Sequence, residues 1–184
     1  MIESVQNKSK KDITIRFAET KDATAIDIVL STYFLDRDDI PYEQFRVAEL
    51  NGKIIGCAVF EKLETPAEKG AEAGAEVGAE VGAENEAEAA AEPETFFEIH
   101  TIAVMPSYKG KGYGKMLLER LISDIQSLPE AKGIHQIYTR TTAPDFFIHE
   151  GFEKADIDKR RRWDECARCN KIEICSRIIL VKNI

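Results

Sequence analysis

The chain has 184 residues, of which 43% are hydrophobic, and its formal net charge is -8 at pH 7. This size predicts a single domain with a sizeable core. Because no stretch approaches the ~20 apolar residues of a membrane helix, we expect a cytoplasmic protein with no membrane partner.

The first half of the chain predicts a strand, a helix and a hairpin. Residues 13–18 alternate in polarity as a strand does, and residues 22–34 have helical spacing after Asp22, a residue type that favours the N-cap. The hairpin is predicted from strands at 45–50 and 53–63, which flank the turn signal Asn51-Gly52.

Residues 64–94 form a low-complexity insert that repeats Glu, Ala and Gly. The insert holds ten Glu and one Lys, so the rest of the chain is nearly neutral. Each Gly costs a helix about 1 kcal/mol relative to Ala, and Glu repeated at i,i+4 repels itself. With little apolar surface to bury, the insert is predicted to be disordered. The alternative is an acidic arm that binds a basic partner.

The second half predicts a strand, a helix and a further strand, followed by shorter elements. A strand is predicted at 96–104 and a helix at 115–125. Gly133 ends the helix region, and a further strand is predicted at 134–141. A short helix is then predicted at 144–151, and candidate strands at 152–157 and 171–181. Hairpins before one strand-helix-strand crossover indicate an α/β fold with a mixed, largely antiparallel central sheet flanked by helices.

Three glycines alternate with lysines where the strand at 96–104 turns into the helix. The free amides and the dipole of a helix N-terminus bind phosphate, and glycines let the phosphate approach closely. The spacing excludes the Walker loop, because Lys115 is followed by Met116, and it excludes the dinucleotide loop, which would need glycine at Lys115.

The segment KGKGYG (109–114), preceded by IAVMP, resembles the Arg/Gln-x-x-Gly-x-Gly/Ala pyrophosphate loop of the GNAT superfamily of acetyl-CoA-dependent N-acetyltransferases. Lys109 replaces the usual Arg or Gln. The resemblance covers nearly the whole chain outside the insert and a basic, Cys-containing C-terminal extension at 159–184. It implies a GNAT-like fold and acetyl-CoA as co-substrate. The residues implied to bind it are Ile102, Ala103, Val104, Lys109, Gly110, Lys111, Gly112, Tyr113, Gly114 and Lys115.

Glu98 lies where some members of the superfamily carry a general base. A base is needed because an ammonium near pKa 10 must lose a proton before its nitrogen can attack the thioester. Strand alternation puts His100 on the same face as Glu98, so His100 is a second candidate. The alternative is that Glu98 is a solvated strand residue.

The general acid is less defined, because Phe147 stands where many relatives carry a tyrosine that protonates the leaving thiolate. Either coenzyme A leaves as the thiolate, or Tyr138 or His149 donates the proton. Both of these side chains also fit ordinary packed or surface roles.

The segment TRTTAPDFFIHEGFEKADID (139–158) closely resembles single-domain N-acetylglutamate synthases, which implies L-glutamate as the amine substrate. Its two carboxylates would be matched by Arg16 and Arg140, although either arginine could instead make a structural ion pair. The alternatives are a protein or peptide N-acetyltransferase, or a CoA-binding regulator without catalysis. A homodimer is left open.

Cys166, Cys169 and Cys175 in the C-terminal extension have metal-like spacing. A structural zinc would need a fourth ligand, from Cys57, His135 or His149, and reduced packing cysteines are the favoured interpretation. The basic run at 159–162 reads as a solvated face, with the ribose phosphate of coenzyme A as another partner. No nucleic-acid partner is expected from a nearly neutral domain without a clear binding motif.

Overall fold

The computed structural model describes residues 13–66, 94–171 and 174–184. Most of the predicted insert therefore lies outside the described residues. The strands are β1 (Ile13–Phe17), β2 (Arg46–Leu50), β3 (Lys53–Glu64), β4 (Thr95–Val104), β5 (Gln136–Thr141), β6 (Glu153–Lys154) and β7 (Ile178–Asn183). The α-helices are α1 (Ala23–Ser31), α2 (Tyr113–Gln126), α3 (Pro144–His149) and α4 (Asp164–Ala167).

All seven strands join one sheet in the order β1-β2-β3-β4-β5-β7-β6. The pair β4 and β5 is parallel, and the other neighbouring pairs are antiparallel. The predicted mixed, largely antiparallel sheet with one crossover is therefore confirmed. Asn51 and Gly52 have positive φ angles of 51° and 75°, as the predicted hairpin turn requires.

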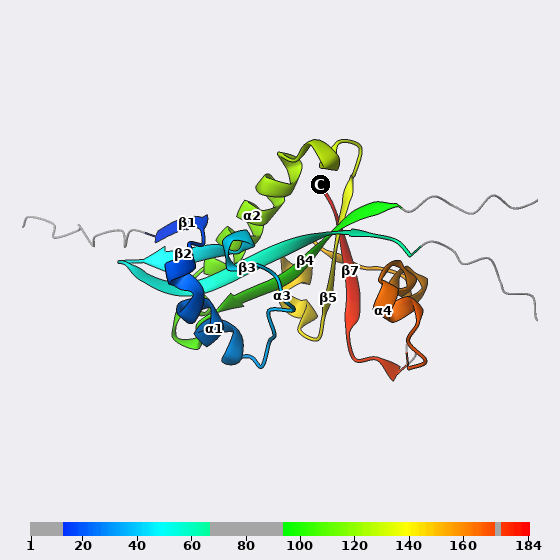
Figure 1. Cartoon of the computed structure of the whole chain (residues 1–184). Helices are drawn as coiled ribbons and strands as arrows, with labels where there is room; N and C mark the ends of the chain where they lie inside the picture. Colours follow the sequence, from blue (N-terminus) through cyan, green and yellow to red (C-terminus); the bar gives the residue numbers. More distant parts are fainter. Residues whose placement is uncertain (1–12, 67–93, 172–173) are drawn as a thin grey trace, which may run out of the picture.

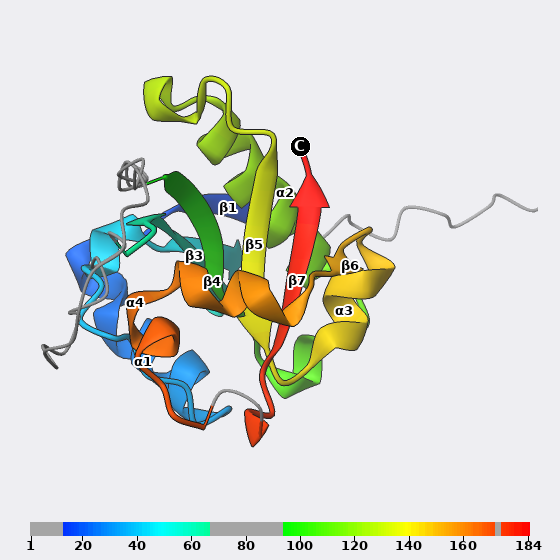
Figure 2. The same ribbon diagram turned by 90° about the vertical axis from the view of Figure 1, so that its right-hand side faces the viewer.

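Helices cover both faces of the sheet. Figures 1 and 2 show α2 on one face and α1 with α4 on the other. The largest core cluster joins α2 to the sheet and includes Leu117, Leu121 and Phe147, whereas Ile26 and Val29 of α1 belong to a second cluster on the opposite face. No described helix is both long and apolar enough to span a bilayer.

The predicted boundaries are confirmed for some elements and wrong for others. Helix α2 ends at Gln126, one residue beyond the predicted end at 125, and a short turn and the 3-10 helix Pro129–Ala131 fill the region up to Gly133. The candidate strand at 152–157 shrinks to two residues. Strand β7 begins at Ile178 rather than 171, since Ile178 pairs with Thr141, the last residue of β5. Residues 172 and 173 of the predicted strand lie outside the described residues.

Two irregularities in β4 shape the centre of the sheet. The register with β3 shifts so that Val59 pairs with Thr101 and Phe60 with Ile99, which leaves His100 as the extra residue of a bulge. The parallel pairing with β5 covers only Phe97 and Glu98. The C-terminal half of β4 therefore presents an edge that β5 does not pair with.

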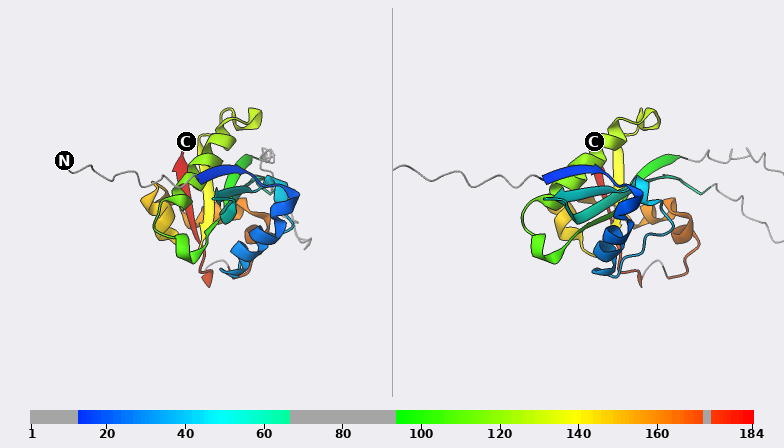
Figure 3. Two further views of the ribbon diagram at one scale, coloured as in Figure 1. Left: turned by 90° about the vertical axis from the view of Figure 1, so that its left-hand side faces the viewer. Right: turned by 60° about the vertical axis from the view of Figure 1, so that its left-hand side comes forward.

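Strands β3 and β4 run together to the limit of the described residues, as Figures 1 and 3 show. Glu64 pairs with Thr95, the Thr65 amide donates to the Glu94 carbonyl at 2.9 Å, and the Glu94 amide donates to the Thr65 hydroxyl at 2.8 Å. Hydrogen bonds between Thr65 and Glu94 thus hold the end of β3 next to the start of β4.

Candidate active site

The glycine loop lies between β4 and the N-terminus of α2. Gly110 and Gly112 have φ angles of 72° and 83°, in the left-handed region that favours glycine, and Gly112 is the N-cap of the 14-residue helix. A Cβ built on either residue would meet nothing within 4 Å. The helix N-terminus is therefore approachable, as an anion site requires.

The third glycine has a different role. A Cβ on Gly114 would come within 3.2 Å of the Phe146 ring on α3. Its missing side chain therefore makes room for the packing of α3 on α2. Sequence spacing alone does not separate this packing role from close approach to a ligand.

The three lysines of the loop have unlike surroundings. The Lys109 ammonium lies 4.5 Å from the centre of the Tyr33 ring, and that of Lys111 donates to the Ser107 carbonyl at 3.1 Å. Lys115 instead makes an ion pair with Glu150 at 2.9 Å. The positive charge nearest the open turn thus comes from Lys109 and Lys111.

Tyr33 also reaches the free edge of β4. Its hydroxyl donates to the Val104 carbonyl, while the amide of the same peptide unit, on Met105, donates to Ile55 of β3. The Val104 carbonyl must therefore point away from β3, toward the unpaired side. The sequence did not single out Tyr33, which the predicted helix at 22–34 includes; that boundary is wrong, because α1 ends at Ser31.

Glu98 is buried rather than solvated, with 2% of its surface exposed. Its two oxygens accept hydrogen bonds of 2.9 and 3.0 Å from Arg140, and the Trp163 indole donates to it at 2.6 Å. The predicted base and a predicted substrate-binding arginine are thus each other's partners. Both functional roles stay predictions.

Arg140 is held on several sides. Its guanidinium also pairs with Glu165 of α4, contacts the Cys166 sulfur at 3.5 Å and lies 4.7 Å from the centre of the Trp163 ring. Burial disfavours the charged form, but the bonds to Glu98 and the other contacts outweigh it, so the pKa of Arg140 is raised. The C-terminal extension therefore helps to build this cluster, which its sequence did not indicate.

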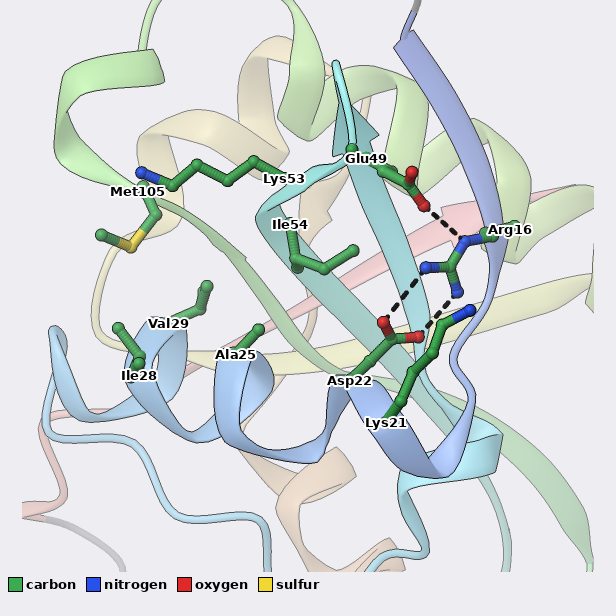
Figure 4. Close-up of a pocket in the computed structure, with 11 residues that line it drawn as sticks. Arg16, Lys21, Asp22, Ala25, Ile28, Val29, Glu49, Lys53, Ile54 and Met105 are labelled. Atoms are coloured by element: carbon green, nitrogen blue, oxygen red, sulfur yellow. Dashed lines mark hydrogen bonds and ion pairs between the residues drawn. The ribbon is translucent and has the colours of Figure 1, made fainter.

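Arg16 has carboxylate partners as well. Figure 4 shows its guanidinium between Asp22 and Glu49, with hydrogen bonds of 2.6 Å to Asp22 and 2.7 Å to Glu49. These residues border a pocket of about 700 Å³ that also has an apolar wall of Ala25, Val29, Ile54 and Met105.

The two predicted substrate arginines are not brought together. Arg16 lies on β1 and Arg140 on β5, four strand spacings apart in the sheet, which is on the order of 19 Å. One glutamate molecule is too short to bridge them. The ion pairs that the sequence left as the alternative are present at both positions.

His100 sits at the bulge between two acidic side chains. Its Nε2 lies 3.1 Å from Asp38 and 3.7 Å from Glu61, and its Nδ1 lies 3.0 Å from the Thr101 hydroxyl. Asp38 belongs to the irregular segment after α1, where its φ angle is 50°. Asp38 and Glu61 could not be identified from the sequence, since their approach to His100 depends on long-range pairing.

The alternatives for the general acid lie on β5 and α3, and their roles stay predictions. Phe147 is buried against Phe146 and Phe152, and the Tyr138 hydroxyl donates to Gln136 at 2.9 Å. His149 is the last residue of α3.

The cysteines do not form a metal centre in the described part of the chain. No His, Cys, Asp or Glu residues there form a group of three or more that could hold a metal ion, so the predicted ligands Cys166, Cys169 and Cys175 are not brought together. Cys57 is buried, and burial raises the pKa of its thiol to about 12.

The chain is similar in sequence to known acetyltransferases. Residues 15–154 match the family described as "Acetyltransferase (GNAT) family". An uncharacterized N-acetyltransferase of Chlorobaculum tepidum is 25% identical over 89 residues, which cover 47% of this chain and 55% of that protein. The matched segment thus spans little more than half of that relative.

Solved structures with the same fold were determined in complex with different molecules. N-acetylglutamate synthase from Neisseria gonorrhoeae, complexed with coenzyme A and N-acetyl-glutamate, gives a TM-score of 0.61 at 21% identity, covering 95% of this chain and 36% of that one. Arabidopsis thaliana Naa50, in complex with the bisubstrate analogue CoA-Ac-MVNAL, gives 0.56 at 16% identity, covering 94% and 99%.

Proposed function

This chain belongs to the acetyltransferase (GNAT) family, and on that premise we propose that it transfers the acetyl group of acetyl-CoA to a primary amine by direct attack. The observation that carries the proposal is the approachable N-terminus of α2, with left-handed Gly110 and Gly112 in front of it. Backbone amides there suit a pyrophosphate. The adjoining free edge of β4, at Ile102, Ala103 and Val104, suits the acyl and pantetheine groups.

The identity of the amine is a finer proposal. L-glutamate is the acceptor implied by the resemblance of 139–158, and the N-acetyl-glutamate in one related structure supports it. The peptide analogue in another supports a peptide N-terminus equally. For glutamate, Arg16 or Arg140 would have to exchange a protein carboxylate for one of the substrate, because both are already paired.

The test is the release of coenzyme A with a panel of amines that holds glutamate, glutamine, aspartate, polyamines and a peptide. Preference for glutamate over glutamine, reduced in Arg140→Lys or Arg16→Lys, would support the amino-acid acceptor, because lysine keeps the charge but loses bidentate geometry. Preference for the peptide would support the alternative acceptor. Binding of coenzyme A without turnover of any amine would leave a CoA-binding regulator instead of an enzyme.

A further inference from the structure

We propose that Glu61, acting with His100, accepts the proton of the attacking amine; this assignment rests on the proposed acetyl transfer. Glu61 and Glu98 are paired neighbours on β3 and β4. Both carboxylate oxygens of Glu98 already accept hydrogen bonds from Arg140, and one of them also accepts a hydrogen bond from Trp163. Among the described residues, the one ion pair of Glu61 is with the His100 imidazole, at 3.7 Å.

Glu61 lies on the face of the sheet that suits an incoming amine. Phe60 packs in the core cluster under α2, so the next side chain on the strand points to the opposite face. Because Phe60 and α2 share one core cluster, the proposed coenzyme site at the N-terminus of α2 belongs to the Phe60 side, and in this proposal the acceptor enters from the opposite face. The Glu61 side chain is 30% exposed there, whereas that of Glu98 is 2% exposed.

The surroundings of Glu61 make it a stronger base than an ordinary glutamate. Burial is the main cause that raises the pKa of its carboxyl, and the nearby carboxylates of Glu98 and Asp38 raise this pKa further. The positive charges of His100 on β4 and Arg140 on β5 lower it, but the net pKa is raised. A carboxylate whose pKa is closer to the working pH takes a proton more readily and still ionises.

The chemistry balances without another reactant. The ammonium gives one proton to the Glu61 and His100 couple, and the freed lone pair attacks the thioester carbon. The carbon–sulfur bond breaks, and the second proton moves from the acylated nitrogen to the leaving thiolate. Asp38, 3.1 Å from His100 and exposed, is a positioning residue that holds the ring and leads the first proton to solvent.

The experiment measures turnover and acetyl-CoA affinity against pH in the parent, in Glu61→Gln and in the matched control Glu64→Gln, an exposed glutamate on the same strand. We expect Glu61→Gln to lower kcat about 10²-fold at neutral pH, with a loss that shrinks as pH rises because more amine is already neutral. Affinity for acetyl-CoA and the activity of Glu64→Gln should match the parent.

A second pair of measurements separates a proton route from a packing effect. His100→Gln combined with Glu61→Gln should cost no more than the larger single change, because the two residues form one route. Asp38→Asn should change the NMR signals of the His100 ring, because Asp38 lies 3.1 Å from its Nε2, and the chain has only three histidines to assign. An equal loss at every pH in Glu61→Gln, or full activity, would overturn the assignment. A parent that binds acetyl-CoA but acetylates no amine would instead overturn the proposed function, and the proton route with it.

Discussion

Arg140 donates two parallel hydrogen bonds, of 2.9 and 3.0 Å, to the two carboxylate oxygens of Glu98, and the Trp163 indole donates a third hydrogen bond to the same carboxylate. Three distant segments, β4, β5 and the turn before α4, meet in this contact. Planar bidentate geometry of this kind favours arginine over lysine. The pair is thus a fixed part of the interior.

We expect Glu98→Gln to destabilise the fold by about 3–5 kcal/mol, because it leaves the buried Arg140 charge without its main partner. Denaturant unfolding measures the change. Glu165→Gln is the matched control, since that glutamate also pairs with Arg140 but is 65% exposed, and it should cost under about 1 kcal/mol. Equal stabilities for the two variants would contradict a structural role for Glu98.

Gly112→Asp should abolish binding of coenzyme A. The substitution puts a side chain on a residue with φ of 83° and a negative charge in front of α2, where a pyrophosphate would lie. Calorimetry gives the affinity. Gly112→Ala has the same backbone strain without the charge and should keep measurable binding. Unchanged affinity in folded Gly112→Asp would remove the loop from the coenzyme site.

Tyr33→Phe should strengthen binding of acetyl-CoA by roughly two- to tenfold, the value of one net hydrogen bond. The Tyr33 hydroxyl occupies the Val104 carbonyl, which the coenzyme would use, and phenylalanine keeps the ring beneath Lys109. A titration of the parent and the variant with acetyl-CoA decides it. Weaker binding would mean that the hydroxyl supports the coenzyme rather than competing with it.

Replacing residues 66–93 by a short Gly-Ser turn should leave fold and turnover nearly unchanged. Thr65 and Glu94 already hold the ends of β3 and β4 together through two hydrogen bonds, and loop length changes closure entropy only slowly. Thermal unfolding and release of coenzyme A are the measurements. A trimmed protein that binds coenzyme A but no longer transfers acetyl would assign the segment a part in the reaction.

Local patterns predicted the elements whose signals are local. Asn51-Gly52 marked the hairpin, and the apolar face of residues 117–125 marked α2. The glycine loop was placed correctly at the start of that helix for the same reason, because strand, turn and helix follow one another in the chain.

Long-range pairing explains what the sequence did not reveal. The sequence around His100 does not indicate a bulge, because the bulge is defined only by how β4 pairs with β3. Trp163 reads as an isolated aromatic residue, yet it packs on Phe96 and Tyr138 and bonds to Glu98. The sequence indicated Arg16 and Arg140 as candidate site residues, but it did not indicate which carboxylates they pair with.

The sheet order has a consequence for the newly made chain. Strand β7 lies between β5 and β6, so β6 is synthesised before the strand that it pairs with exists. Until Ile178 and its neighbours arrive, one edge of β5 stays open, and Phe96 and Tyr138 lack the packing of Ile179. A ribosome paused between these two strands would carry an exposed strand edge beside aromatic side chains, which is a template for aggregation and a target for chaperones.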